Sequence, residues 1–107
     1  MSAFDWLTKM FSQRAKAQSL FARAMEKAKN KDTEGALEDY TAVIRIEKAS
    51  SSLKSMAMFN RALAYSAAGQ YDEAKDDLEA VLAEKSTPSN VRAAAKAKVE
   101  RMRKLAR

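Results

Sequence analysis

An internal repeat is the feature of this sequence that most limits its fold. The segments "EGALEDYTAVIRIEK" (34–48) and "DEAKDDLEAVLAEK" (72–85) share an acidic pair, an apolar residue at Tyr40 or Leu78, and the dipeptide Ala-Val. Ala36 and Ala74, near the start of the match, are 38 residues apart. An aromatic residue followed three positions later by alanine recurs upstream with the same separation, at Phe21 and Ala24 and at Phe59 and Ala62. The sequence therefore predicts two helical hairpins in tandem, each too small to bury its own apolar face, which must stack to be stable.

The rest of the chain also favours helix, which predicts an all-α fold. Gly35, Gly69 and Pro88 are the only glycines and proline, and Ala, Lys, Glu and Leu are frequent. A first helix is expected over about 4–29, with a break or kink left open in the polar patch "SQRAKAQS" (12–19). Further helices are expected after Asp32 as N-cap, after a serine cap in "ASSSLKS" (49–55), after Gly69 as the left-handed closing residue, and in "TPSN" (87–90) with Thr87 as N-cap.

The second hairpin resembles the tetratricopeptide repeat, a 34-residue helix-turn-helix unit. Within 55–88 the sequence "MFNRALAYSAAGQYDEAKDDLEAVLAEKSTP" carries the family's positions as Ala62, Tyr65, Gly69, Tyr71, Ala74, Leu78 and Pro88. The first unit, 17–50, keeps Ala24, Ala36 and Tyr40 but has Lys31 where the turn glycine would stand. The resemblance implies two repeats over 17–88, an N-terminal amphipathic helical extension (1–16), a basic C-terminal capping helix (89–107) and a right-handed α-α superhelix.

Resemblance to this family implies a protein-binding module, a small adaptor or scaffold that holds a peptide or an amphipathic helix in a concave apolar groove. The groove positions carried over from the family are Phe21, Met25, Met56, Phe59, Asn60, Leu63, Arg92 and Lys96. A Met and Phe stripe at helical spacing is also typical of a core. Groove and core therefore stay open as alternatives for Phe21, Met25, Phe59 and Leu63.

One subclass of the family clamps the C-terminal carboxylate of chaperone tails with Lys and Asn side chains. Asn60, Arg92 and Lys96 match positions of that clamp. Phe21 and Met25 stand where its first Lys and Asn would be, so apolar groups replace two of the five anion-binding side chains. The clamp is therefore disfavoured.

The chain lacks the residues that most enzymes and metal sites use. It contains neither Cys nor His, which excludes a disulfide scaffold, a thiolate zinc site and the commonest general base. The carboxylates of one helix, at Asp72, Glu73, Asp76 and Asp77, are typical of a hydrated face. No catalytic, metal-binding or cofactor-binding residue is predicted, and the chain is not expected to be an enzyme.

Charge is distributed in three blocks. Lys and Arg minus Asp and Glu give +5 for 1–31, −5 for 32–88 and +6 for 89–107. Such blocks can satisfy one another within one fold or between two copies. The alternative function is that the basic segment "VRAAAKAKVERMRKLAR" (91–107) binds nucleic acid or another acidic surface through Arg92, Lys96, Arg103 and Arg107. No aromatic residue accompanies it to stack on bases, so nucleic acid is the less favoured partner.

The segment "FDWLTKMF" (4–11) lies outside the repeats and carries a concentrated apolar surface. At about 100° per residue, Phe4, Leu7 and Phe11 share one face, with Met10 beside them and Trp6 further round. The segment is expected to cap the first repeat, to dock on a second copy or in its groove and form a homodimer, or to anchor on a membrane surface. The membrane surface is the least favoured of these. Neither a secretory signal nor an apolar run of roughly 20 residues is present, which predicts a cytoplasmic protein.

Overall fold

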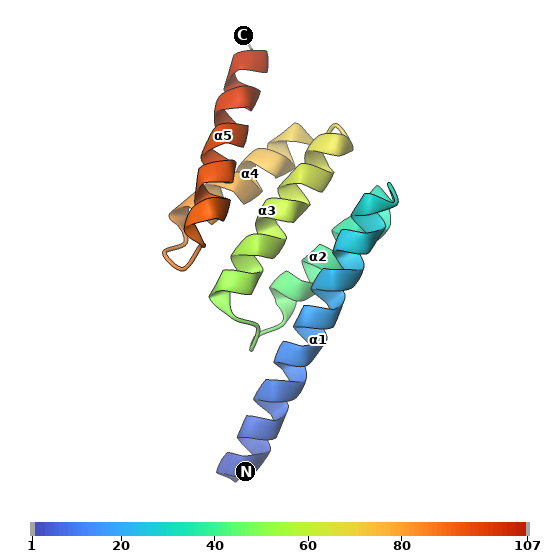
Figure 1. Cartoon of the computed structure of the whole chain (residues 1–107), viewed down its shortest axis with the longest axis vertical. Coiled ribbons are helices and arrows are strands. Elements are labelled where there is room, and N and C mark those ends of the chain that lie inside the picture. Colours follow the sequence, from blue (N-terminus) through green and yellow to red (C-terminus); the bar gives the residue numbers. More distant parts are fainter. Residues whose placement is uncertain (1, 107) are drawn as a thin grey trace.

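The computed structural model describes residues 2–106, and within that range the chain forms five α-helices and no β-strand. The helices are α1 (Ala3–Lys29), α2 (Thr33–Arg45), α3 (Ser51–Ala67), α4 (Tyr71–Ala83) and α5 (Ser89–Leu105) (Figure 1). The all-α prediction is confirmed. No helix among the described residues combines the length and hydropathy that crossing a membrane requires.

The helices are arranged as two antiparallel hairpins followed by a single helix. α1 packs on α2, α3 packs on α4, and α2 joins the hairpins by packing on α3. α5 packs on α4 and touches α3. Figure 1 shows α1, α3 and α5 in one layer with α2 and α4 behind them, in a body 57 Å long and 20 Å thick. The right-handed superhelix implied by the resemblance stays a prediction.

Small residues let the helices approach closely, and the core consists of two clusters: the first contains residues of the first hairpin together with Leu53 and Ala57 of α3, and the second contains residues of the second hairpin with α5. Ala24 and Ala36 are fully buried in the first, and Ala62 and Ala74, 38 residues further on, are fully buried in the second. The larger buried residues around them are Phe21, Tyr40, Val43 and Leu53 in the first cluster and Leu78 and Val81 in the second. Equivalent positions of the repeat therefore have equivalent places in the core.

Two turns of the same geometry close α1 and α3. After α3, Gly69 has φ +79°, its N–H donates to the carbonyl of Ser66, and the N–H of Gln70 donates to that of Tyr65. This is the Schellman arrangement, in which the left-handed residue is usually glycine. After α1, Lys31 takes the same place with φ +64°. The role predicted for Gly69 is confirmed, and the first turn keeps its geometry without a glycine.

Polar side chains define where α2 and α3 begin, as the sequence predicts. The Asp32 carboxylate accepts a hydrogen bond from the Gly35 N–H at 3.0 Å, and the Ser50 hydroxyl accepts one from the Leu53 N–H at 3.1 Å. A Cβ at position 35 would collide with the Asp32 carboxylate. Gly35 is therefore required by the cap rather than by a turn.

α1 runs without interruption through the polar patch at 12–19, so no break or kink divides the expected extension from the first repeat. Ala17, within the patch, is fully buried. The Gln13 carboxamide oxygen accepts a hydrogen bond from the Lys48 N–H at 3.1 Å, and Arg14 Nε donates to the Lys48 carbonyl at 3.2 Å. Two polar residues of the patch, Gln13 and Arg14, therefore hydrogen-bond to the loop between α2 and α3, and α1 continues through the patch.

The prediction that Thr87 caps α5 is wrong. Pro88 is the N-cap, and no side chain caps that helix end. The Thr87 hydroxyl is buried and donates to the Val81 carbonyl at 2.8 Å. Thr87 therefore closes α4, because a carbonyl near the end of that helix lacks a partner within the helix.

Candidate helix-binding surface

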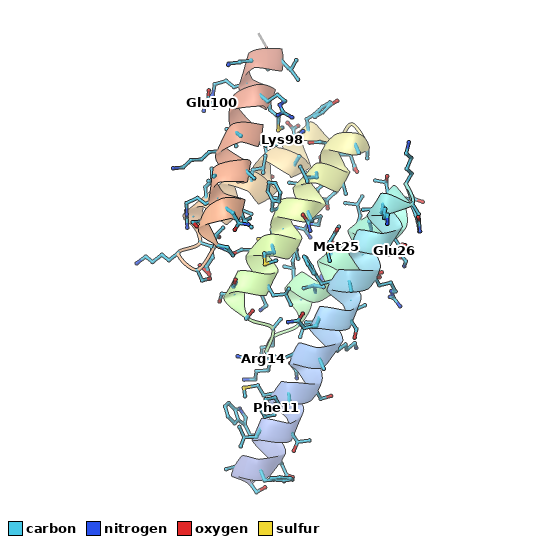
Figure 2. All side chains as sticks on the ribbon, in the orientation of Figure 1. Phe11, Arg14, Met25, Glu26, Lys98 and Glu100 are labelled. Atoms are coloured by element: carbon cyan, nitrogen blue, oxygen red, sulfur yellow. The ribbon has the colours of Figure 1, made fainter. Side chains whose placement is uncertain are left out.

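One exposed side chain on each of α1, α3 and α5 stands in the same relation to a buried alanine. Each follows a fully buried alanine: Met25 follows Ala24, Leu63 follows Ala62, and Lys96 follows Ala95. Because one residue turns a helix by about 100°, the residue after a buried alanine lies at the edge of the buried face. Met25 is 44% exposed and Leu63 40% exposed, and Met25 lies on α1 beside α3 (Figure 2). We call the surface formed by Met25, Met56, Phe59, Asn60, Leu63 and Lys96 the α1–α3–α5 surface.

Met56 and Phe59 on α3 are the partly covered members of this surface. Met56 is half-buried against the core of the first hairpin, and Phe59 is half-buried against that of the second. Both positions therefore combine the groove and core alternatives of the sequence analysis. A partly covered apolar side chain is suited to contact with a partner, and methionine adapts to different shapes.

Phe21, the other predicted groove aromatic, lies in the core. Its side chain is 7% exposed, and its ring meets the Tyr40 ring edge-on, with centroids 5.9 Å apart and planes at 62°. Such an edge-to-face pair is a favoured aromatic geometry. Phe21 therefore packs against α2 in the core and does not belong to the α1–α3–α5 surface.

Asn60 and Tyr40 connect the surface to the second layer of helices. Asn60 is half-buried, and Tyr40 is 2% exposed. Burial raises the pKa of the Tyr40 hydroxyl, and a hydrogen bond with the Asn60 side chain partly opposes that rise. Part of the hydrogen-bonding capacity of Asn60 is therefore used inside the fold.

Arg92 is occupied within the chain. Its guanidinium donates to the carbonyls of Leu82 and Glu84, both at 2.6 Å, and so closes the C-terminal end of α4. Lys96, one turn further along α5, is exposed. The two basic residues expected from the carboxylate clamp therefore differ: Lys96 faces solvent, whereas Arg92 holds α5 against α4.

Residues 55–87, which span α3, the Gly69 turn and α4, match the family model of the tetratricopeptide repeat. The chain contains a tetratricopeptide repeat. No curated protein and no solved structure matches it. Repeats of this family are protein-interaction units and are generally not enzymes, so the general role of this chain is protein interaction.

The tetratricopeptide repeat contains an ion pair that the sequence analysis missed. The Arg61 guanidinium donates to both carboxylate oxygens of Asp77, at 2.8 and 2.7 Å, and to the Thr41 hydroxyl at 3.1 Å. In the hairpin before the repeat, Arg23 donates to both oxygens of Asp39 at 2.7 and 2.9 Å. The two arginines are 38 residues apart, and so are the two aspartates. Aligning the charged positions of the two hairpins in the sequence would therefore have identified both ion pairs.

The carboxylates of α4 are divided between the repeat's interior and solvent. Asp77 is 6% exposed and belongs to the ion pair, whereas Asp72, Glu73 and Asp76 are exposed. Residues 2–106 contain no group of three or more Asp, Glu, His or Cys side chains placed to hold a metal ion.

The N-terminal part of α1 extends beyond the other helices (Figure 1), and it carries two apolar stripes. One stripe faces the loop before α3: Trp6 lies with its ring centroid 5.9 Å from Lys48 Nζ, and Met10 is half-buried. The other stripe consists of Phe4, Leu7 and Phe11, which are 75%, 40% and 65% exposed. Phe11 lies on the part of the helix that extends beyond its neighbours (Figure 2).

The cap alternative for this segment therefore fails for the second stripe. Trp6 and Met10 partly contact the first hairpin, but Phe4 and Phe11 remain uncovered because α1 is one continuous helix that projects past it. The extension does not fold back into the chain's own α1–α3–α5 surface either.

The basic face of α5 is partly satisfied within the chain. Arg92 closes α4, and Arg103 Nη1 lies 3.0 Å from Glu100 Oε1. Arg107, which the sequence analysis placed on this face, lies outside the described residues. Arg92 is therefore occupied within the fold, whereas Arg103, in an ion pair whose side chains are 63% and 59% exposed, still faces solvent.

Proposed function

We propose that this chain is a small adaptor or scaffold whose α1–α3–α5 surface binds an amphipathic helix of a partner protein. The observation that carries the proposal is the equivalent exposure of Met25 and Leu63, 38 residues apart, above the half-buried Met56 and Phe59. An amphipathic helix binds a groove through apolar side chains at i, i+3, i+4 and i+7, and such a row offers matching contacts.

The apolar character of this surface distinguishes the ligand class. The side chains of Met25 and Leu63 have no hydrogen-bond donor. The Asn60 side chain is hydrogen-bonded to Tyr40, and the Arg92 guanidinium to carbonyls at the end of α4. A ligand that binds through apolar side chains is therefore favoured over one held by its terminal carboxylate.

A selection from a displayed library of amphipathic helical peptides tests this proposal. We expect the selected peptide to bind the wild-type chain and to lose at least about tenfold in affinity with Met25→Lys or Leu63→Lys, because a lysine charge would be desolvated in the contact. Ala80→Lys, at an exposed position on α4, is the matched control and should bind as wild type. Equal binding by all three variants would place the ligand on another surface.

We also propose that the N-terminal extension mediates self-association into a homodimer. Phe4 and Phe11 are 75% and 65% exposed next to Leu7, which concentrates apolar surface at one end of a small protein. Light scattering should show a dimer for the full chain and a folded monomer after deletion of residues 1–12. A monomer in both cases contradicts this proposal and leaves the helix-binding proposal intact.

A further inference from the structure

An apolar cleft lies between the first half of α4 and the last half of α5. Its volume is about 630 Å³, and its apolar walls include Tyr71 and Leu78 on α4 and Val99, Met102 and Leu105 on α5. Tyr71 is 60% exposed and Leu105 79% exposed, so the apolar walls reach the surface. The charged residues on the cleft are Asp72, Lys75 and Arg103.

The cleft arises because α5 is held at one end. Ala95, in the first half of α5, is the buried residue of that helix, and Arg92 fastens the same half to the end of α4. The last half continues past its neighbours (Figure 1) and leaves Val99 and Met102 only half-buried. Unlike α1 and α3, α5 is not followed within residues 2–106 by an antiparallel partner helix.

The two walls have the form of a helix-packing groove. On α4, Tyr71 and Lys75 recur at i and i+4 beside the fully buried Leu78, while Val99 and Met102 on α5 recur at i and i+3, ahead of Ala106, the C-cap of that helix. Side chains at these spacings form parallel ridges, between which the side chains of a third helix fit. An apolar hollow of this size also suits large side chains such as phenylalanine.

The same chain has a helix with a matching apolar stripe, of which the two phenylalanines are largely exposed. Phe4, Leu7 and Phe11 recur at i, i+3 and i+7, and they lie roughly a third of a turn from the Trp6 stripe, which contacts the loop before α3. This stripe and the cleft lie near opposite ends of a molecule 57 Å long (Figure 1). Because α1 is one continuous helix, the stripe of a given copy cannot reach that copy's own cleft.

We infer that the α4–α5 cleft is the site in which a second copy of this chain seats its N-terminal helix. The inference rests on the proposed self-association and specifies its receiving surface. Two copies placed side by side and antiparallel bring each extension to the other's cleft, so the pair is symmetric and closed.

The buried area favours this reciprocal arrangement over an open chain of copies. With the exposures given above and about 150–250 Å² for an aromatic side chain, seating Phe4, Leu7 and Phe11 buries on the order of 350 Å² of the helix. The cleft walls expose less surface than the stripe, so one contact buries roughly 570 Å² in all, far below the about 1,200–2,000 Å² of stable interfaces. Two reciprocal contacts bury roughly 1,100 Å², close to the lower end of that range.

Cysteine cross-linking tests the inference directly, because the chain has no native cysteine. Thr8→Cys places a thiol on the extension beside the stripe, and Lys75→Cys places one on the cleft. The two variants are mixed and treated with a short bismaleimide. We expect the Thr8–Lys75 cross-link between copies to exceed that of Thr8→Cys with Ala80→Cys, an exposed control on α4, by at least about tenfold, because docking raises the effective concentration.

A second measurement keeps the receiving surface separate from self-association itself. Met102→Asp, with circular dichroism to verify its helix content, should weaken dimerisation at least about tenfold, because it places a charge in the apolar cleft. A dimer that cross-links Thr8 mainly to Thr8, or to Leu63→Cys, would overturn the cleft as receiver while leaving self-association standing.

A chain that is monomeric at every concentration contradicts both self-association and this inference. Vesicles of anionic phospholipid provide the remaining comparison. Monomeric chain that binds them through Phe4 and Phe11, and loses that binding in Phe4→Ser/Phe11→Ser, would overturn the inference in favour of a membrane-surface helix.

Discussion

Arg61 on α3 and Asp77 on α4 are joined by two parallel hydrogen bonds, at 2.8 and 2.7 Å, in the interior of the second hairpin. Their side chains are 18% and 9% exposed. The equivalent pair in the first hairpin, Arg23 and Asp39, has the same geometry, but the Arg23 side chain is 60% exposed. The repeat thus places one ion pair in each hairpin, with different degrees of burial.

We expect Arg61→Ala to lower the free energy of unfolding by about 3 kcal/mol, because it leaves the Asp77 carboxylate buried without a partner. Arg23→Ala should cost less, because Asp39 keeps Lys27 Nζ at 3.0 Å. Urea denaturation of the two variants measures the difference. Arg61→Lys, which keeps the charge without the two-bond geometry, should lie between Arg61→Ala and wild type. Equal losses for Arg61→Ala and Arg23→Ala would contradict the role of burial.

Lys31 and Gly69 both have left-handed backbone conformations, so introducing glycine at the first and removing it at the second should have opposite effects on stability. Lys31→Gly should stabilise the chain by about 1 kcal/mol, because glycine relieves the steric cost of a side chain at φ +64°. Gly69→Ala should destabilise it by a similar amount, about 1 kcal/mol. A Cβ at Gly69 would meet no atom within 4 Å, so the effect comes from the backbone alone. Thermal unfolding provides the measurement, and a destabilised Lys31→Gly would argue against strain at that turn.

The Asp39 carboxyl predicts a loss of stability in acid. The hydrogen bond from Arg23, aided by Lys27, lowers the pKa of Asp39 below its usual value of 3.8, although burial opposes the change. Because the folded-state pKa is lowered, the stabilisation is present above the unfolded value and is lost as the pH falls from there through the folded pKa. Asp39→Asn should therefore reduce the dependence of unfolding free energy on pH below about pH 4. Glu47→Gln, whose side chain is 84% exposed, is the control and should leave that dependence unchanged.

Replacing Arg92 should change the stability of the fold and not the binding of a peptide carboxylate. Arg92→Ala should lower the free energy of unfolding by about 2 kcal/mol, because two charged hydrogen bonds to α4 carbonyls are lost. An acidic peptide with a free C-terminus should bind the wild-type chain no better than the same peptide with an amidated C-terminus. Calorimetry with both peptides checks this, and a clear preference for the free carboxylate would restore the clamp.

Local features of the chain were predictable from sequence because they depend on residues close to one another. The scarcity of glycine and proline predicts an all-α fold, and Asp32, Ser50 and Gly69 occupy the predicted cap and turn positions. The resemblance to the tetratricopeptide repeat, carried by residues such as Ala62, Tyr65 and Gly69, predicted a unit at about 55–88, and the family model matches 55–87. At the two caps and the Gly69 turn, the backbone groups and the residues that satisfy them lie within a few positions of each other.

What only the tertiary structure decided depends on residues far apart in the chain. Gln13 and Arg14 in the polar patch of α1 bind the backbone of Lys48, more than thirty residues away. Phe21 is a core residue because Tyr40 covers its ring, and Arg92 is occupied because the end of α4 lies beside it. Periodicity states which residues share a helix face, whereas the neighbouring helix determines whether that face is covered. The uncovered stripe of Phe4, Leu7 and Phe11 and the α4–α5 cleft are such cases: both follow from where the helices diverge, which no local pattern encodes.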